Sequence, residues 1–139
     1  PLAYRPKGWG STIKEILMKT ECRSARFALH DKIYPCPLSV AMDLLGGKWR
    51  AVILYHLQDG PQRFTALRRL LPGATEAVLS RRLQQLEQDG LLSRQVFGEK
   101  PPLRTEYALT DFGRSVLPAL NALLQWGNRV VTERGRFVD

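Results

Sequence analysis

The sequence contains few of the residues that build metal centres and disulfide frameworks, with two cysteines and two histidines in 139 residues. Cys22, His30 and Cys36 are spaced by eight and six positions, which matches no zinc-binding pattern. Two cysteines also do not make the framework of a disulfide-rich secreted domain. We therefore predict no metal site and no cofactor.

Catalytic groupings and long apolar runs are also missing. His30 and His56 have no nucleophile or carboxylate arranged around them in the sequence, so we do not expect an enzyme. No apolar run approaches the roughly 20 residues needed to cross a bilayer, and no signal-peptide pattern opens the chain. We expect a cytoplasmic protein with no membrane partner. Its 44% hydrophobic and 24% charged residues are typical of one soluble globular domain.

Positive charge is concentrated in two segments of a chain whose net charge is +8. Residues 1–35 hold seven basic and three acidic residues, and residues 61–104 hold eight and four. The remaining segments, 36–60 and 105–139, are balanced. A local basic excess indicates a polyanionic partner.

The chain divides into an N-terminal arm over residues 1–34, a folded domain over 35–132 and a tail over 133–139. In the arm, Thr12 and Glu15 are spaced as a capping box for a short helix. The triplet at 14–16 is what a purine-rich ribosome-binding site would encode, which suggests the hypothesis that the natural start is Met18. Recovery of intact residues 1–17 from the native host would contradict it.

The folded domain begins with two helices. Pro37 suits the first position of a helix, which makes Cys36 its N-cap, and the helix ends at Gly46-Gly47. We expect Lys48 to open the second helix, whose apolar face holds Trp49, Val52, Ile53 and Leu57.

A helix-turn-helix pair follows. After an extended piece at Arg63-Phe64, we expect Thr65 to cap a third helix that ends at Pro72-Gly73. The fourth helix has Thr75 as its cap, leucines at 79, 83 and 86 on one side, and Gly90 at its end. Its opposite side carries arginine, amides and small residues, which suits reading base edges in a DNA major groove. An ordinary solvated helix is the alternative.

Two strands and a terminal helix complete the pattern. Residues 92–97 and 103–109 read as strands around a stiff tip that carries Lys100, so they form a hairpin, or wing. Thr110 is expected to cap the last helix, which Pro118 should bend. This helix is so apolar that we expect it to pair with the first helix in a two-fold dimer; the alternative is packing on its own domain. The predicted dimer residues are Val40, Leu44, Val116, Leu117, Leu120, Leu123, Leu124, Trp126 and Val130.

Several motifs together resemble the HxlR-type winged-helix transcription regulators. They include Cys36-Pro37-Leu38, the run from Leu44 to Trp49, Arg63-Phe64, Leu79-Ser80, Asp89-Gly90-Leu91 and Leu109-Thr110. The resemblance implies a mainly α fold with a small β-hairpin (α+β), in which the first and last helices form the dimer. It also implies binding to double-stranded DNA, with each recognition helix in a major groove and each wing along a minor groove.

Candidate DNA contacts follow from these positions. Those expected to face the groove are Thr75, Glu76, Ala77, Ser80, Arg81 and Gln84. Arg81 can pair with guanine and Gln84 with adenine, whereas Glu76 is awkward beside phosphates. Candidate phosphate contacts are Lys48, Arg63, Arg68, Lys100 and Arg104. Arg82 leans toward the buried side and is expected to be a structural ion-pair residue.

The sequence defines the signal that would control the protein less well than it defines the DNA partner. A thiol at a helix N-terminus has a lowered pKa, and the resemblance implies oxidant or electrophile sensing at Cys36, with Cys22 as a possible partner. A plain N-cap role for Cys36, a non-covalent effector and a winged helix used only for protein contact stay open. Trp49 and Trp126 are expected in the core or the dimer rather than in an effector cage.

Overall fold

A computed structural model of the chain describes residues 27–29, 31–34, 36–136 and 138. The expected capping box of Thr12 and Glu15, and also Cys22, lie outside these residues. The structure divides into two compact units, residues 1–46 and residues 47–139.

In the first unit, a short hairpin precedes a helix. Strands β1 (Phe27–Leu29) and β2 (Lys32–Tyr34) pair antiparallel, and this hairpin was not predicted. Helix α2 (Pro37–Leu45) follows Cys36, whose extended backbone makes it the N-cap, as expected. Asp43 joins the two elements, because its carboxylate accepts hydrogen bonds from the Lys32 ammonium group, at 3.4 Å, and from the Tyr34 hydroxyl.

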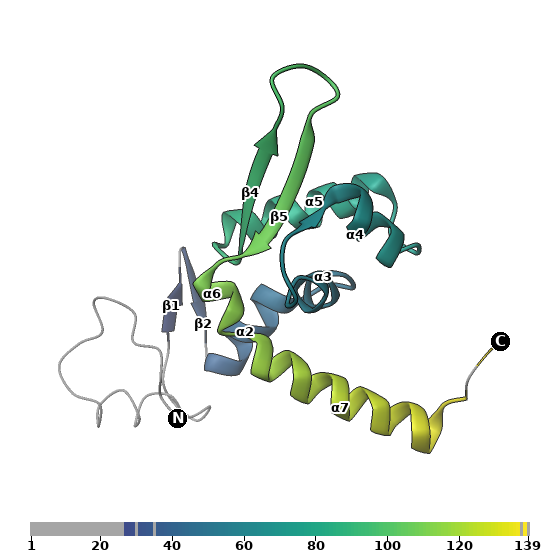
Figure 1. Ribbon diagram of the computed structural model, residues 1–139. Helices are drawn as coiled ribbons and strands as arrows, with labels where there is room; N and C mark the ends of the chain where they lie inside the picture. Colours follow the sequence, from purple (N-terminus) through teal and green to yellow (C-terminus); the bar gives the residue numbers. More distant parts are fainter. Residues whose placement is uncertain (1–26, 30, 35, 137, 139) are drawn as a thin grey trace. The chain divides into compact units, whose positions relative to one another are not determined.

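The second unit is a winged helix (Figure 1). Its elements in chain order are α3 (Arg50–His56), β3 (Gln62–Arg63), α4 (Phe64–Leu70), α5 (Glu76–Gln88), β4 (Leu92–Phe97), β5 (Arg104–Leu109), α6 (Asp111–Arg114) and α7 (Leu117–Arg134). The three strands form one antiparallel sheet in the order β3-β5-β4. The β4–β5 hairpin, here called the wing, projects beyond α4 and α5. This arrangement confirms the predicted α+β fold class.

The core of this unit is built from aliphatic side chains of three helices and the base of the wing. Those with no exposed surface are Ile53, Leu54, Leu57, Leu67, Leu79, Leu83 and Leu86. Burying each such side chain stabilises the fold by about 1.5–3 kcal/mol. Leu92, Tyr107 and Leu109 extend the core into the sheet.

Helix α5 has the limits that the sequence predicted. The Thr75 hydroxyl accepts a hydrogen bond from the Val78 amide at 3.2 Å, which caps the first turn. At the other end, Gly90 has φ +77°, and the Leu91 amide donates to the Leu86 carbonyl at 2.9 Å. Glycine adopts this left-handed backbone at little cost and thereby ends the helix.

Two helix starts and one core position differ from those predicted. Helix α4 begins at Phe64 with Arg63 as N-cap, so Thr65 is not its cap; pairing of β3 with β5 places the helix start directly after Arg63. Helix α3 begins at Arg50, two residues after Lys48. On α3, Val52 is 37% exposed and Leu54 is buried in its place.

The C-terminal segment is two helices rather than one bent helix. Thr110 caps only the short α6, where its hydroxyl accepts from the Gly113 amide at 3.0 Å. The chain turns at Ser115 and Val116, and Pro118 lies in the first turn of α7. Proline is tolerated there because the first turn lacks internal hydrogen-bond partners, so it starts α7 instead of bending it.

Replacing Gly113 by alanine should destabilise the fold. Gly113 is buried, and an added Cβ would overlap the backbone carbonyl oxygen of Leu91. Because backbone must shift to admit it, we expect Gly113→Ala to lower the free energy of unfolding in urea by about 1–3 kcal/mol. Arg114→Ala, at the exposed neighbouring position, should change it by no more than about 0.5 kcal/mol. Equal effects of the two substitutions would contradict this packing.

Candidate nucleic-acid interface

One face of α5 is buried and the opposite face is open to solvent. The three leucines of the helix have no exposed surface. The six side chains predicted to face DNA are all exposed: Thr75, Glu76, Ala77, Ser80, Arg81 and Gln84. Because residues follow one another at about 100° around a helix, burial of the leucines turns these side chains outward. These six exposed residues, polar except for Ala77, are here called the α5 face.

Glu76 is paired in a way that the sequence did not reveal. Its carboxylate lies 3.1 Å from a terminal nitrogen of Arg68, which extends from the last turn of α4. Both side chains are more than half exposed, so the pair adds little stability. It does offset the negative charge of Glu76 at the start of the α5 face, and it engages Arg68, which we expected to contact phosphate.

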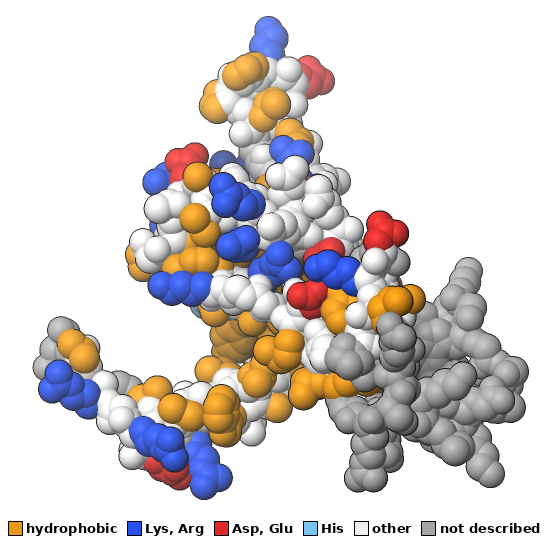
Figure 2. Space-filling view, turned by 180° about the vertical axis from the view of Figure 1, so that it is seen from behind, with side chains coloured by type: hydrophobic (Ala, Val, Ile, Leu, Met, Phe, Trp, Pro, Cys, Tyr) orange, Lys and Arg blue, Asp and Glu red, His pale blue; other side chains and the backbone are white. Residues whose placement is uncertain are grey.

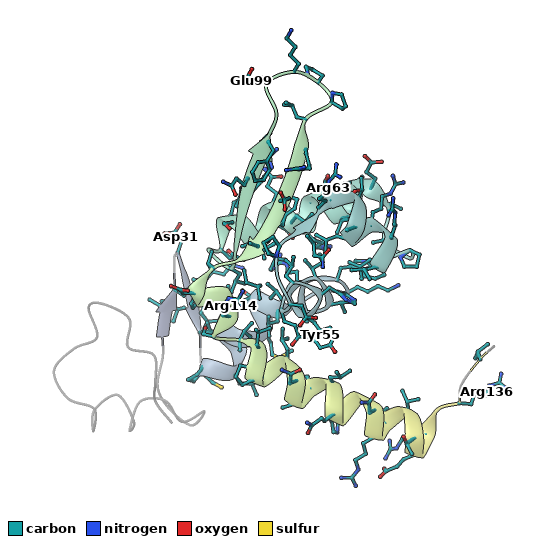
Figure 3. The ribbon with its side chains drawn as sticks, viewed as in Figure 1. Asp31, Tyr55, Arg63, Glu99, Arg114 and Arg136 are labelled. Atoms are coloured by element: carbon teal, nitrogen blue, oxygen red, sulfur yellow. The ribbon has the colours of Figure 1, made fainter. Side chains whose placement is uncertain are left out.

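The other predicted phosphate contacts lie around the α5 face in different settings. Arg63 and Lys100 are exposed, at the start of α4 and at the tip of the wing. Arg104, at the start of β5, lies over the Phe97 ring at 4.8 Å and 3.7 Å from the Glu106 carboxylate. Lys48 lies over the Trp49 ring at 5.1 Å. Figure 3 shows Arg63 between the wing and the α4–α5 helices.

A polar cluster beneath α5 holds the helix against α3. The side-chain oxygen of Gln85 accepts hydrogen bonds from Arg50 at 2.8 Å and from Arg82 at 2.9 Å. Arg50 also lies 3.9 Å from Asp89, the C-cap residue of α5. Arg82 is thus structural, as expected, but it bonds an amide rather than a carboxylate. The cluster holds the C-terminal half of α5 against α3.

Sequence reasoning missed one cation near this surface. Arg94 lies on β4, opposite Tyr107 of β5, and is exposed. The alternation of side chains along a strand could have drawn attention to Arg94. It lies two residues after Leu92, on the same side of β4, and Leu92 is buried. That side of β4 changes from buried to exposed between these two positions.

The predicted dimer residues differ in how far the structure exposes them. Leu120 is buried within its own unit, where α7 packs against α3. Farther along α7 the apolar side chains are exposed: Leu123, Leu124, Trp126, Val130 and Val131. In Figure 2, hydrophobic side chains lie along α7, the helix at lower left. In the first unit, Val40 and Leu44 are half-buried.

Cys36 is disulfide-bonded in the structure. It is the N-cap residue of α2 and is 8% exposed. The only other cysteine of the chain is Cys22, which lies outside the described residues. No cluster of three or more possible metal ligands occurs among the residues that the structure describes, and no helix there is long and apolar enough to span a membrane.

Comparison with known proteins places the chain among regulators. A sequence model of the HxlR-like helix-turn-helix family matches residues 44–135. The HTH-type transcriptional regulator YybR of Bacillus subtilis (strain 168) is 41% identical over 110 residues, which cover 75% of this chain and 87% of YybR. An HTH-type regulator of Methanothermobacter thermautotrophicus is 45% identical over 97 residues, which cover 70% and 73%.

Solved structures of regulators also match this chain. The reduced form of the redox regulator HypR matches with a TM-score of 0.64 and 37% identity, and the match covers 68% of this chain and 92% of HypR. The reduced form of the transcriptional regulator YodB from B. subtilis matches with a TM-score of 0.60 and 32% identity, over 73% and 98%.

The Gln85 cluster yields a stability prediction. In Gln85→Ala, two part-buried guanidinium groups lose their shared acceptor. Because hydrogen bonds to charged groups contribute about 1.5–3 kcal/mol, we expect the free energy of unfolding in urea to fall by roughly that amount. Gln84→Ala, which removes an exposed side chain one position earlier, should change it by at most about 0.5 kcal/mol. A Gln85→Ala variant as stable as Gln84→Ala would refute the bracing role.

Proposed function

The chain belongs to the HxlR-like helix-turn-helix family of transcriptional regulators, and on this premise we propose that it binds an inverted-repeat operator in double-stranded DNA as a homodimer. The observation that carries this proposal is the exposed α5 face, which is polar and presents Arg81, while the three leucines on the opposite side of the helix are fully buried. A rigid helix with such a face suits a major groove.

Base reading is assigned to two side chains of the α5 face. Arg81 is exposed in the middle of the helix and makes no ion pair with any described residue, so its guanidinium group is available to donate hydrogen bonds to the O6 and N7 atoms of a guanine. Gln84 lies three residues, slightly less than one helical turn, after Arg81 and offers both a donor and an acceptor to adenine. The capped N-terminus of α5 at Thr75 supports a phosphate contact through free backbone amides.

Phosphate contacts are assigned to the surrounding cations. Lys100 at the wing tip and Arg63 at the start of α4 are both exposed. Such contacts set affinity and salt dependence but carry no sequence information. The α5 face contains no aromatic or large aliphatic side chain, which argues against a surface for protein contact alone.

Dimerisation is supported by the exposed apolar side chains of α7. Leu123, Leu124 and Trp126 are 48%, 43% and 65% exposed, and they follow one another over about one turn of the helix. A contiguous apolar surface of this kind indicates a contact with another chain. An isologous two-fold contact would set two α5 helices about 34 Å apart, or a multiple of that, which requires an inverted repeat.

Control by oxidation is proposed for Cys36. The solved relatives include HypR, described as a redox regulator in reduced and oxidised forms. Here Cys36 is disulfide-bonded at the start of α2, the helix that carries the predicted dimer residues Val40 and Leu44. Reduction by a dithiol would deliver two electrons and two protons and leave two thiols. The N-cap of α2 would thereby lose its covalent tether.

DNA reading is tested with variants of Arg81 and Lys100. DNA from upstream of the gene serves as the probe in gel-shift and footprinting experiments, with the molar mass of the free protein measured by sedimentation. Arg81→Ala should relax base preference at one position in each half-site. Lys100→Ala should weaken binding to all DNA sequences alike and reduce the slope of log affinity against log salt by about one unit. A monomer that binds no DNA at low salt would overturn the proposal.

The redox proposal is tested by DNA affinity with dithiothreitol or diamide. We expect the wild-type protein to change its affinity for the upstream DNA at least about tenfold between the two conditions, a coupling of about 1.4 kcal/mol. Cys36→Ser should have the same affinity in both, because no disulfide forms at this position. Ser39→Ala, in the first turn of α2, is the control and should respond as the wild type does. A response that survives in Cys36→Ser would rule out this cysteine as the sensor.

A further inference from the structure

A cleft opens between the start of α5 and the side of the wing. It has a volume of about 320 Å³ and is lined by residues from five elements of the second unit: β3, α4, α5, β4 and β5. Its polar lining includes Arg63, Ser80, Arg94, Arg104, Thr105 and Tyr107. Three arginines from β3, β4 and β5 thus converge on one hollow beside the α5 face.

The sheet register explains why Arg94 enters this cleft. Arg94 is paired with Tyr107, so the two side chains lie on the same side of the sheet. Leu92 and Leu109, on that same side, are buried in the core. On β4 the side chain at position 94 is exposed, so Arg94 lines the cleft beside the buried Tyr107.

The charge in the cleft is strongly positive. Among the residues that the structure describes, neither Arg63 nor Arg94 makes an ion pair. Arg104 shares its charge with Glu106 at 3.7 Å. The one carboxylate in the lining, Glu76, is paired with Arg68 at 3.1 Å. Two arginines are thus left without a counter-ion in a hollow that also offers the hydroxyls of Ser80 and Thr105.

We infer that this cleft binds a phosphate group, with Arg94 as a contact residue alongside Arg63 and Arg104. Planar guanidinium groups match the oxygens of a phosphate in pairs, and hydroxyl groups add neutral donors. Since all three arginines are solvent-exposed, binding requires little desolvation of buried charge. An apolar ligand would find few partners in such a lining.

The phosphate source that the position favours is the DNA backbone. The inference rests on the proposed function here, because the cleft adjoins Ser80 of the α5 face on one side and the wing on the other. A DNA strand that runs from the major groove occupied by α5 toward the wing would pass over this cleft. Arg94 would then hold that strand without reading its bases.

The test compares the salt dependence of DNA binding in Arg94→Gln with that in a matched variant, Arg114→Gln. Arg114 is an exposed arginine on α6, outside the cleft. Both variants are titrated against the upstream DNA and against a mixed-sequence duplex of about 30 base pairs, roughly three helical turns, between about 50 and 200 mM salt. We expect Arg94→Gln to lower the slope by about one unit on both duplexes, Arg114→Gln to leave it unchanged, and Arg94→Lys to restore most of it.

A second arm separates the two sources of phosphate. Inorganic pyrophosphate is titrated into the free full-length protein by calorimetry. Pyrophosphate binding that is lost in Arg94→Gln, with an unchanged DNA slope, would assign the cleft to a free phosphorylated molecule and overturn the DNA assignment. A wild-type slope in Arg94→Gln without pyrophosphate binding would overturn the inference altogether. Failure of the wild-type protein to bind any duplex would instead count against the proposed function.

Discussion

Burial of the leucine stripe of α5 is the constraint on which the interface depends. Leu79, Leu83 and Leu86 have no exposed surface, and together they stabilise one rotation of the helix by several kcal/mol. Turning α5 by a single residue, about 100°, would expose all three. The α5 face is therefore a consequence of core packing, and its polar side chains need no contacts of their own to be held outward.

Four arginines of this unit have two different physical roles. Arg50 and Arg82 are part-buried and share the side-chain oxygen of Gln85, so their hydrogen bonds brace the helix from beneath. Arg63 and Arg94 are exposed and make no ion pair within the described chain. A cation that keeps its solvation in the free protein can release counter-ions when it meets phosphate, which is the source of salt-dependent affinity. The same residue type thus supports both the scaffold and its surface.

Thr110 couples the end of α5 to the wing and to the C-terminal helices. Its hydroxyl donates to the Gly90 carbonyl at 2.6 Å and accepts from the Gly113 amide at 3.0 Å. Leu91 follows α5, and its carbonyl accepts from the Thr110 amide at 3.2 Å. A few residues therefore join the helix, both strands of the wing and α6. Because α7 follows α6 directly, a contact made through α7 would position the α5 face and the wing together.

The local signals in the sequence were sufficient for α5, the wing and the family, because caps, helical periodicity and strand alternation act over a few residues. Thr75 and Gly90 mark helix ends by backbone chemistry that needs no distant partner. The start of α4 could not be predicted from the capping residue Thr65. It is set by the pairing of β3 with β5, which lies some forty residues later in the chain. The Arg68–Glu76 pair and the convergence of Arg63, Arg94 and Arg104 likewise depend on the folded chain. Tertiary structure decided these features because each joins segments whose separation in space no local pattern records.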